Sequence, residues 1–565
     1  MDKAFTTVVE ASIADLGAAL ERGQISAEAL LGLYLDRIAR YDHAGITLNS
    51  IVVMNPDAMI EARASDTRRA VGQSLGPLDG IPYTAKNSYK VRGLTVAAGS
   101  PAFADLVATD DAFAIARLRA GGAVLIGLTN MPPMANGGMQ RGLYGRAESP
   151  YNADYLAAAF ASGSSNGSGT ATAASFAAFG LGEETWSSGR APAANNGLCA
   201  YTPSRGVISV RGNWPLVPTM DVVVPHTRSM ADMLALLEVI VADDPQTRGD
   251  FWRSQPWVSL PQVREVRPAS YADLAKGASL AGRRFALPAI YVNADPLAGT
   301  GTAGVGGPTG QAIETRASIL ALMEAACAAI RAAGGEVLVT DFPMIHNYEG
   351  DRAHAPTIQT RGLVGADFLR IEVTDLSAWA MDDFLVANAD PTLPGLAHAD
   401  GALIFPPPPG ALPDRYTGFD DRIGDYPAHA RAHPGWSYLD MPHLEQGLRG
   451  LEETRRIDLE AWMDALGVDA VIFPALADVG PADADVNPAS ADLAWRNGVW
   501  VANGNLAIRH LGVPTVTVPM GMMADIHMPA GLTFAGRAYD DSLLLTFACA
   551  FEATGSYRQP PPRTP

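Results

Sequence analysis

Two serine-bearing turns lie close together in the sequence and are the part of the chain best suited to chemistry. The first is the Gly/Ser run 163–168, and the second is the turn 185–190, which carries Ser187 and Ser188. The alanine-rich segment 171–179 between them has the character of a buried helix, which a flexible Gly/Ser linker would not have. We therefore expect a buried loop–helix–loop that brings the two serine-bearing turns together. A serine hydroxyl is a weak nucleophile at neutral pH and needs a nearby base.

The segment 162–206 resembles the signature of the amidase signature family of serine hydrolases. The family pattern aligns with it without a gap, and Arg190 and the run Pro203-Ser204-Arg205-Gly206 coincide with family residues. By this alignment Ser164 corresponds to the family's bridging serine and Ser188 to its nucleophile. Their separation, 188 − 164 = 24 residues, is the family spacing. Gly80-Ile81-Pro82 with Lys86 is similar to the family's GIPxxxKD, whose lysine is catalytic.

This resemblance implies a mechanism and a set of site residues. In the family a neutral lysine is the base, so the expected relay runs from Lys86 through Ser164 to Ser188. The resemblance also implies a cis peptide bond at Gly163–Ser164. The backbone N–H groups expected to hold the oxyanion are those of Thr185, Trp186, Ser187 and Ser188. The residues expected to contact the substrate are Met134, Gly137, Gly138 and Trp186.

Three departures from the family signature bear on the substrate more than on the reaction class: Asn166 replaces a glycine, Glu184 replaces an aspartate, and Trp186-Ser187 replaces Gly-Gly. A further departure is Asn87, which replaces the acid after the lysine and so removes a carboxylate that would favour the charged amine. The indole of Trp186 can supply a flat apolar wall that favours aromatic or planar substrates. Alternatively, Trp186-Ser187 could block the oxyanion pocket and leave a binding protein without catalytic activity.

Other motifs compete with this interpretation. Residues 163–167 also satisfy G-x-S-x-G, the nucleophile elbow of α/β-hydrolases with Ser165 as nucleophile, but 155–161 lacks the β-branched residues of the strand that should precede it. His429 and His433 lack the glutamate of H-E-x-x-H. The glycine-rich run 299–307 lacks the Lys-Ser/Thr of a phosphate loop. We therefore expect no metal and no organic cofactor.

Alternating helices and strands must position these turns. Two helices are predicted within 12–42, the first with a capping box of Ser12 and Asp15, and another over 312–333. A turn leads into a short strand that ends at Lys86, short runs predict strands at 124–130, 207–210, 285–288 and 336–339, and regular structure returns at 470–475. The blocks 512–519 and 529–532 resemble the closing strands of the amidase signature family. Such alternation predicts an α/β fold, a twisted mixed β-sheet covered by helices on both faces.

The segment 345–442 is weakly patterned and rich in proline and glycine. In the family, the corresponding zone shapes the acyl or leaving-group pocket. We therefore expect a single amidase-like domain over 1–565, with an irregular insertion at about 345–442 that covers the active site. The alternative is that this segment is a surface excursion with no functional role.

Composition limits the partners. The net charge is −19, from 41 Lys and Arg against 60 Asp and Glu, which argues against nucleic acid or an anionic membrane. Cys199, Cys327 and Cys549 are far apart and predict no disulfide framework. No apolar run reaches the roughly 18 residues of a membrane span, and the N-terminus lacks the apolar core of a secretory signal. We expect a cytoplasmic enzyme, and the sequence leaves a homodimer open.

These features predict a hydrolase that cleaves a carboxylic amide, or a related anilide, hydrazide, carbamate or ester, through a seryl acyl-enzyme. Its substrate would be a small molecule cleaved at a C–N bond other than a peptide bond. The glutaminase subunit of a tRNA-dependent amidotransferase, from the same family, is an alternative. The acidic charge and the long insertion argue against it, and a partner subunit found on purification would favour it.

Overall fold

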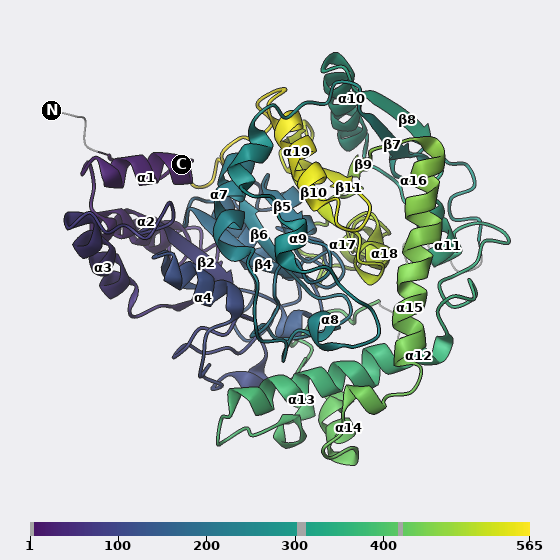
Figure 1. Ribbon diagram of the computed structural model, residues 1–565, viewed down its shortest axis with the longest axis horizontal. Helices are drawn as coiled ribbons and strands as arrows, with labels where there is room; N and C mark the ends of the chain where they lie inside the picture. The colour runs from purple at the N-terminus through teal and green to yellow at the C-terminus, as the bar shows by residue number, and fades with distance from the viewer. Residues whose placement is uncertain (1–4, 302–311, 416–421) are drawn as a thin grey trace.

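The structure is a computed structural model that describes residues 5–301, 312–415 and 422–565. The strands in these ranges form one sheet in the order β1-β3-β2-β4-β6-β5-β10-β11-β9-β7-β8 (Figure 1). β2 runs parallel to both β3 and β4, and β7 runs parallel to both β8 and β9, while the remaining neighbours are antiparallel. The sheet is therefore mixed, as the sequence predicts.

The strand bounds are β1 Ile51–Met54, β2 Pro82–Lys86, β3 Val124–Thr129, β4 Phe179–Glu184, β5 Cys199–Thr202, β6 Val222–Thr227, β7 Arg284–Pro288, β8 Glu336–Thr340, β9 Ala470–Pro474, β10 Thr515–Met522 and β11 Pro529–Ala535. The helices up to the middle of the chain are α1 Ile13–Glu21, α2 Ala27–Tyr41, α3 Ala58–Ala70, α4 Phe113–Ala120, α5 Asn166–Ala173, α6 Arg190–Asn195, α7 Met230–Ile240, α8 Phe251–Ser254, α9 Val263–Val266 and α10 Ala317–Ala332. Those that follow are α11 Pro343–Glu349, α12 Ala366–Ile371, α13 Ser377–Asn388, α14 Tyr426–Ala432, α15 Leu444–Arg455, α16 Ala461–Leu466, α17 Pro488–Ala494, α18 Asn505–His510 and α19 Asp541–Glu552.

Helices cover both faces of the sheet, and side-chain size differs between the faces. Phe534 of β11 packs on Phe551 of α19, and their ring centres are 6.1 Å apart. Gly531, which points to the other face of the same strand, lies against α6, where an added Cβ would be 3.1 Å from the Cβ of Ala194. Gly180 of β4 likewise faces α5, where an added Cβ would be 2.6 Å from Ser168 Oγ. Large apolar side chains therefore form the core under α7 and α19, and small residues let α5 and α6 approach closely.

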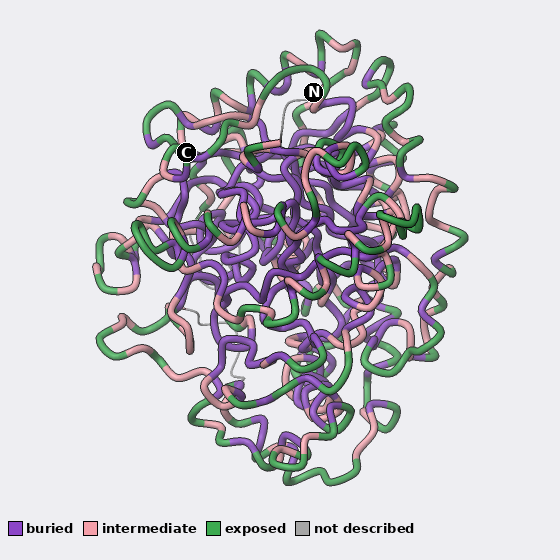
Figure 2. The backbone as a smooth tube through the Cα atoms, turned by 90° about the vertical axis from the view of Figure 1, so that its left-hand side faces the viewer, coloured by how far each residue is buried: buried purple, intermediate pink, exposed green. Residues whose placement is uncertain are grey.

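Figure 2 shows that buried residues fill the centre of the molecule, while exposed residues follow its rim. Every residue of β2, β3, β6, β9 and β11 is buried. Strands covered by helices on both faces have this pattern. The segment 161–205 lies within this interior and contains only two residues that are not buried, Glu183 and Trp186.

Several predicted elements are confirmed. The two N-terminal helices are α1 and α2, and Ser12 with Asp15 forms the predicted capping box. The strand that ends at Lys86 is β2, and the other predicted strands correspond to β3, β7, β8, β9, β10 and β11. The predicted helix at 312–333 is shorter, since α10 spans Ala317–Ala332. Most of the glycine-rich run 299–307 lies outside the described residues.

Three expectations are wrong. Residues 207–210 form no strand, because the Val207 N–H donates to the Ser204 carbonyl in a turn and the Val210 N–H donates to the Asp250 carboxylate. The helix of the serine-bearing stretch begins earlier than predicted, at Asn166, and Phe179 belongs to β4. The segment 345–442 is not irregular throughout, since it contains α12, α13 and α14 and most of α11.

Candidate active site

The candidate residues meet at one edge of the sheet because of how β2 and β4 pair. The two strands are parallel neighbours, with Ala85 opposite Leu181, so their carboxyl ends lie side by side. Lys86 is the last residue of β2, and the turn that carries Ser188 follows β4 directly. In sheets with parallel strands, ligand sites form outside the carboxyl ends of those strands.

Lys86 and Ser164 are in direct contact in the interior. The Lys86 Nζ donates a 2.7 Å hydrogen bond to Ser164 Oγ, and both side chains are buried. Burial lowers the pKa of Lys86 because the charged ammonium loses its hydration, and the nearby Glu183 carboxylate opposes this effect. The lysine predicted as the base therefore has the environment that favours its neutral form.

Ser188 lies beside this pair without completing a hydrogen-bonded chain. The Ser165 N–H donates to the Ser188 carbonyl at 3.2 Å, which joins the two serine-bearing turns. Among the described residues, no hydrogen bond connects the hydroxyls of Ser164 and Ser188. The peptide bond before Ser164 is trans, so the predicted cis bond is wrong for this structure. For a bond that does not precede proline, trans is the form of lower energy.

A buried ion pair fixes the turn around Ser188. The Glu184 carboxylate accepts the backbone N–H groups of Gly189 at 3.1 Å and Arg190 at 2.9 Å, and it pairs with the Arg190 guanidinium. That guanidinium also donates to the Trp186 carbonyl at 2.7 Å. Glu184, which stands where the family has aspartate, thus holds both sides of the turn that presents Ser188.

The predicted oxyanion donors do not all remain available. The Ser187 N–H donates to Ser162 Oγ at 3.0 Å, and the Ser187 hydroxyl donates to the Ser162 carbonyl at 2.7 Å. The expectation that Ser187 contributes an oxyanion donor is therefore wrong, because its N–H is already used to join the two turns. The N–H groups of Thr185 and Ser188 donate no hydrogen bond within the described ranges. Together with Trp186, they remain predicted donors.

Two adjoining cavities open on this edge of the sheet. A cavity of about 90 Å³ is lined by Ser188 and Trp186, and one of about 260 Å³ is lined by Lys86 and Glu183. Both cavities are lined by Ala135, Thr185 and Leu216. The candidate nucleophile and the candidate base therefore line two neighbouring cavities that have three lining residues in common.

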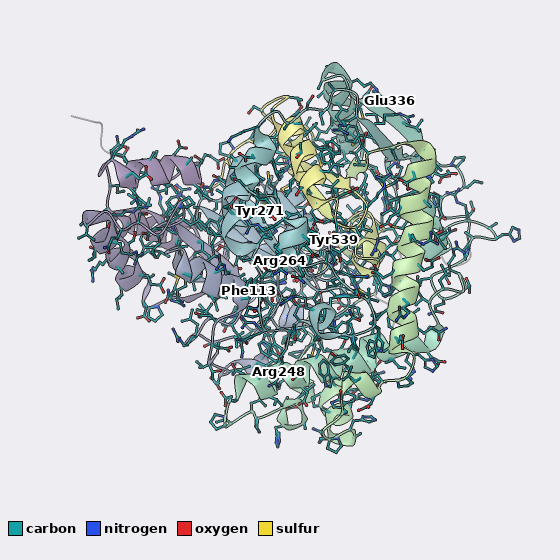
Figure 3. The ribbon with its side chains drawn as sticks, in the orientation of Figure 1. Phe113, Arg248, Arg264, Tyr271, Glu336 and Tyr539 are labelled. Carbon is teal, nitrogen blue, oxygen red and sulfur yellow. The ribbon has the colours of Figure 1, made fainter. Side chains whose placement is uncertain are left out.

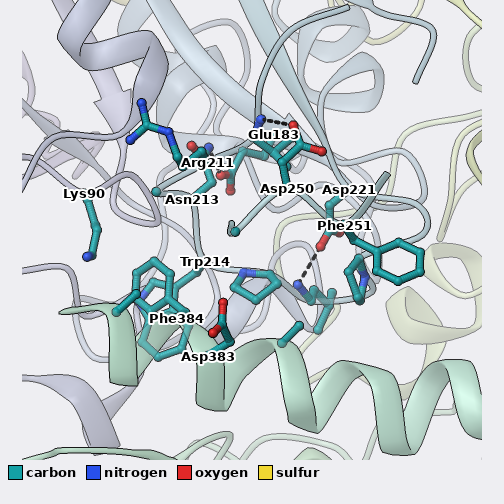
Figure 4. Close-up of a pocket in the computed structure, with 18 of the residues that line it drawn as sticks. Lys90, Glu183, Arg211, Asn213, Trp214, Asp221, Asp250, Phe251, Asp383 and Phe384 are labelled. Carbon is teal, nitrogen blue, oxygen red and sulfur yellow. Dashed lines mark hydrogen bonds between the residues drawn. The ribbon is translucent and has the colours of Figure 1, made fainter. Parts of the chain in front are cut away.

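The segment predicted to cover the site does line both cavities. Figure 4 shows Asp383 and Phe384 of α13 below the larger cavity, with Trp214 close to them and Glu183 on the opposite side. Phe405 and Asp414, from the loop after α13, line the smaller cavity. Apolar and charged side chains of this segment therefore both line the two cavities.

Of the residues predicted to contact substrate, Gly137 and Trp186 line the smaller cavity, and Met134 and Gly138 do not line either one. The expectation for Met134 is wrong because its side chain is buried in an apolar cluster with Trp214. Gly138 packs against the loop before Ser164, where an added Cβ would lie 2.1 Å from the Ala159 carbonyl oxygen. Its role is to allow that close approach. Trp186 packs edge-on against Trp500, with ring centres 5.9 Å apart.

The structure argues against an alternative nucleophile and an alternative base for a serine hydrolase. Ser165 is buried, and its hydroxyl donates to the Glu183 carbonyl at 2.9 Å and accepts the Glu183 N–H at 3.0 Å. Both ring nitrogens of His226 are also occupied, by Ser168 Oγ at 3.0 Å and the Gly189 carbonyl at 2.8 Å. Burial lowers the pKa of His226 to about 4.

Two acidic residues that the sequence analysis did not single out face the site. Glu183 Oε2 is 3.6 Å from Lys86 Nζ. Asp221 accepts the Thr185 hydroxyl at 2.6 Å, and burial raises the pKa of Asp221 to about 7. A signal for Glu183 was present in the sequence, because Glu183 and Glu184 are consecutive acids directly before the second serine-bearing turn.

Among the described residues, one group of side chains has ligand atoms close enough for a metal ion: Asp295, Asp341 and His346. Arg352 lies among them and donates to Asp295 at 2.5 Å. The guanidinium therefore already supplies positive charge to this group, which lines neither cavity. In the described part of the chain, no helix combines the length and the apolar character needed to cross a bilayer.

Comparisons with known proteins agree with this geometry. The Amidase family model matches residues 29–272. The A subunit of the glutamyl-tRNA(Gln) amidotransferase from Azoarcus sp. is 33% identical over 283 residues, which is 50% of this chain and 55% of that protein. The corresponding protein of Thiobacillus denitrificans is 29% identical over 474 residues, or 77% and 91% of the two chains. The chain spans about half the length of the first of these relatives.

Solved structures match over nearly the whole chain. The native peptide amidase from Stenotrophomonas maltophilia is 25% identical, with a TM-score of 0.73 over 98% of each chain. A bacterial aryl acylamidase of the amidase signature enzymes shares the fold, at 17% identity and a TM-score of 0.66 over 97% of each chain. The signature residues, the mixed sheet flanked by helices and these matches lead to one conclusion: residues 29–272 match the Amidase family, and the chain as a whole has the fold of the amidase signature enzymes.

Proposed function

We propose that this chain is an amidase-type serine hydrolase in which Ser188 is the nucleophile, Ser164 the bridging serine and Lys86 the base. The observation that carries the proposal is the buried 2.7 Å hydrogen bond from Lys86 Nζ to Ser164 Oγ, one residue from the backbone bond that joins the two serine turns. Burial lowers the pKa of Lys86, which favours the neutral amine that can accept a proton.

In the proposed first half-reaction, Lys86 takes the proton of Ser164 while Ser164 takes that of Ser188. Ser188 Oγ then bonds to the substrate carbonyl carbon, and the oxyanion is held by the N–H groups of Thr185, Trp186 and Ser188. The C–N bond breaks, and the relay returns the proton to the leaving amine. Water then attacks the acyl-enzyme by the same route and releases the acid. The Ser188 hydroxyl must turn toward Ser164 for this relay, and catalytic contacts are often open before substrate binds.

The cavities bear on the substrate class. Trp186, Phe405 and Trp495 give the smaller cavity an aromatic lining next to Ser188, which suits a flat or apolar group beside the scissile carbonyl. The larger cavity would take the remainder of the substrate, under the cover formed by 345–442. We propose a small amide, with anilides, hydrazides, carbamates and esters as related substrates. Because a structural neighbour is a peptide amidase, amides of short peptides belong in the same panel.

A second candidate function is supported by the names of the relatives. The matching amidotransferase A subunits favour a glutaminase role in which ammonia is passed to a partner. Under that role, the purified chain would release ammonia from glutamine only when its partner subunits are present. The aromatic lining beside Ser188 supports the stand-alone hydrolase instead, because the side chain of glutamine offers no aromatic surface to it.

A substrate panel tests the proposal. Purified protein and Ser188→Ala would be assayed with aryl and alkyl amides, peptide amides, glutamine, esters and carbamates. The proposal expects turnover of aryl amides by the wild type without added protein, and its loss in Ser188→Ala. Turnover of glutamine alone, dependent on a co-purified partner, would establish the glutaminase role in its place.

A further inference from the structure

Glu183 approaches Lys86 from the end of β4, the strand parallel to the one that carries the lysine. Its Oε2 lies 3.6 Å from Lys86 Nζ, and the two side chains are 12% and 1% exposed. At this distance, a carboxylate and an ammonium attract each other strongly when they are shielded from water. Glu183 is therefore the acid placed to stabilise a proton on Lys86.

The carboxylate of Glu183 is fixed on both of its oxygens. Ser88 Oγ donates to Oε2, and Asn213 Nδ2 donates to Oε1. The backbone of Glu183 is fixed as well, because its N–H donates to Ser165 Oγ and its carbonyl accepts from the same hydroxyl. Ser165 is the residue after Ser164. These hydrogen bonds fix the position of Glu183 relative to Lys86 and Ser164, and they leave its carboxylate little freedom to move away.

Other titratable groups lie near Lys86, and each of them pairs with or hydrogen-bonds to a different residue. Glu184 is paired with Arg190 and caps the Ser188 turn. Asp221 accepts the Thr185 hydroxyl and the Leu216 N–H, and burial raises its pKa to about 7. His226, which faces the lysine from β6, has a pKa lowered by burial and is neutral at pH 7. Of the acids that oppose the lowered pKa of Lys86, Glu183 is the strongest.

We propose that Glu183 is a positioning residue of the relay, which holds the Lys86 amine toward Ser164 and stabilises the ammonium that forms when Lys86 accepts the serine proton. This inference rests on the proposed function. The proton leaves Ser188, passes through Ser164 to Lys86 as the Ser188–carbonyl bond forms, and returns from Lys86 to the leaving group. Glu183 stays a carboxylate throughout, so the step needs no further reactant.

The charge of Glu183 has two opposite consequences. It assists the proton transfer, because the transition state develops positive charge on Lys86. It also keeps Lys86 protonated to a higher pH, which makes the resting enzyme inactive at the acid end of its range. Glu183→Gln removes the charge and keeps the size of the side chain. We therefore expect a lower maximal rate. We also expect the acid limb, the low-pH part of the plot of kcat against pH where the rate rises, to be displaced toward lower pH.

The experiment measures kcat and KM from about pH 5 to about pH 10 for the wild type, Glu183→Gln and Glu183→Asp, on a substrate that the wild type cleaves. Glu183→Gln should lower the plateau kcat roughly ten-fold, leave KM within a few-fold, and move the acid limb down by about one pH unit or more. Glu183→Asp retains the charge and should keep the acid limb close to that of the wild type. Glu336→Gln is the matched control, since Glu336 is an exposed glutamate on the edge strand β8, far from the site (Figure 3).

Several outcomes would overturn the inference. In one, Glu183→Gln lowers kcat but leaves the acid limb in place, as a purely structural role predicts. In another, Asp221→Asn moves the limb and Glu183→Gln does not, which would assign the effect to Asp221. If Glu183→Gln does not fold, Glu183→Asp decides. An acid limb of Glu183→Asp that is displaced by as much as one pH unit from that of the wild type contradicts the inference, and an acid limb at the wild-type position supports it. The proposed function is tested separately: it fails if Lys86→Ala stays active, whatever Glu183→Gln does.

Discussion

Replacing Lys86 by alanine should abolish most of the activity while leaving the fold intact. An exposed lysine with a pKa of about 10.4 is neutral in roughly one molecule in 2,500 at pH 7, a penalty of about 4.6 kcal/mol for any step that needs the free amine. Burial lowers the pKa of Lys86 and reduces this penalty. A positioned general base contributes about 10²- to 10⁴-fold, so Lys86→Ala should lower kcat by that factor, or about 3–5 kcal/mol in activation free energy.

Two further variants test whether Lys86 acts as a base or only supplies a positive charge. Lys86→Arg keeps the charge, but a guanidinium does not deprotonate in proteins, so it should be as inactive as Lys86→Ala. Lys276→Ala removes an exposed lysine that pairs with Asp273 and should match the wild type. The wild-type rate should rise with pH and level off below the ordinary lysine pKa, because burial lowers that of Lys86. Near-normal kcat in Lys86→Ala together with an inactive His226→Ala would refute the lysine mechanism.

Two other substitutions test the surroundings of Ser188. Trp186→Gly should reduce the preference for aromatic over aliphatic substrates, measured as a ratio of kcat/KM values, by about ten-fold, and Trp186→Phe should keep that preference. An unchanged ranking of substrates in Trp186→Gly would mean that the indole only packs on Trp500. Glu184→Gln leaves the buried Arg190 guanidinium without its carboxylate, so the free energy of unfolding should fall by about 3–5 kcal/mol. The Tm of this variant should therefore be lower than that of Glu336→Gln. Equal Tm values would show that the ion pair does not hold the turn.

Much of the fold and the positions of the candidate site residues could be predicted because their signals are local. The capping box of α1 and the apolar runs of β3, β7 and β9 are short patterns that tertiary packing preserves. Lys86 could be placed at a strand end, because Gly80-Ile81-Pro82 marks where that strand begins. The spacing of Ser164 and Ser188 is likewise read directly from the chain.

The remaining features depend on contacts between distant residues. The apolar run 207–210 looks like a strand, but the Asp250 carboxylate, 40 residues away from Val210, takes the donor that a ladder would need. The Ser187 N–H is used by Ser162, 25 residues earlier, which no local pattern indicates. The consecutive acids Glu183 and Glu184 are visible in the sequence, but the approach of Glu183 to Lys86 depends on the parallel pairing of β2 and β4, which only the strand order shows.

The central claim is that Ser188 forms the acyl-enzyme, and covalent labelling tests it most directly. A fluorophosphonate reacts with an activated serine, and mass mapping of the digested protein locates the label. The relay predicts a label on the peptide that contains Ser188, with labelling lost in Ser188→Ala and much slower in Lys86→Ala. A label on the peptide that contains Ser165 and not Ser188 would contradict the account, even though the Ser165 hydroxyl is bound to β4 in the structure.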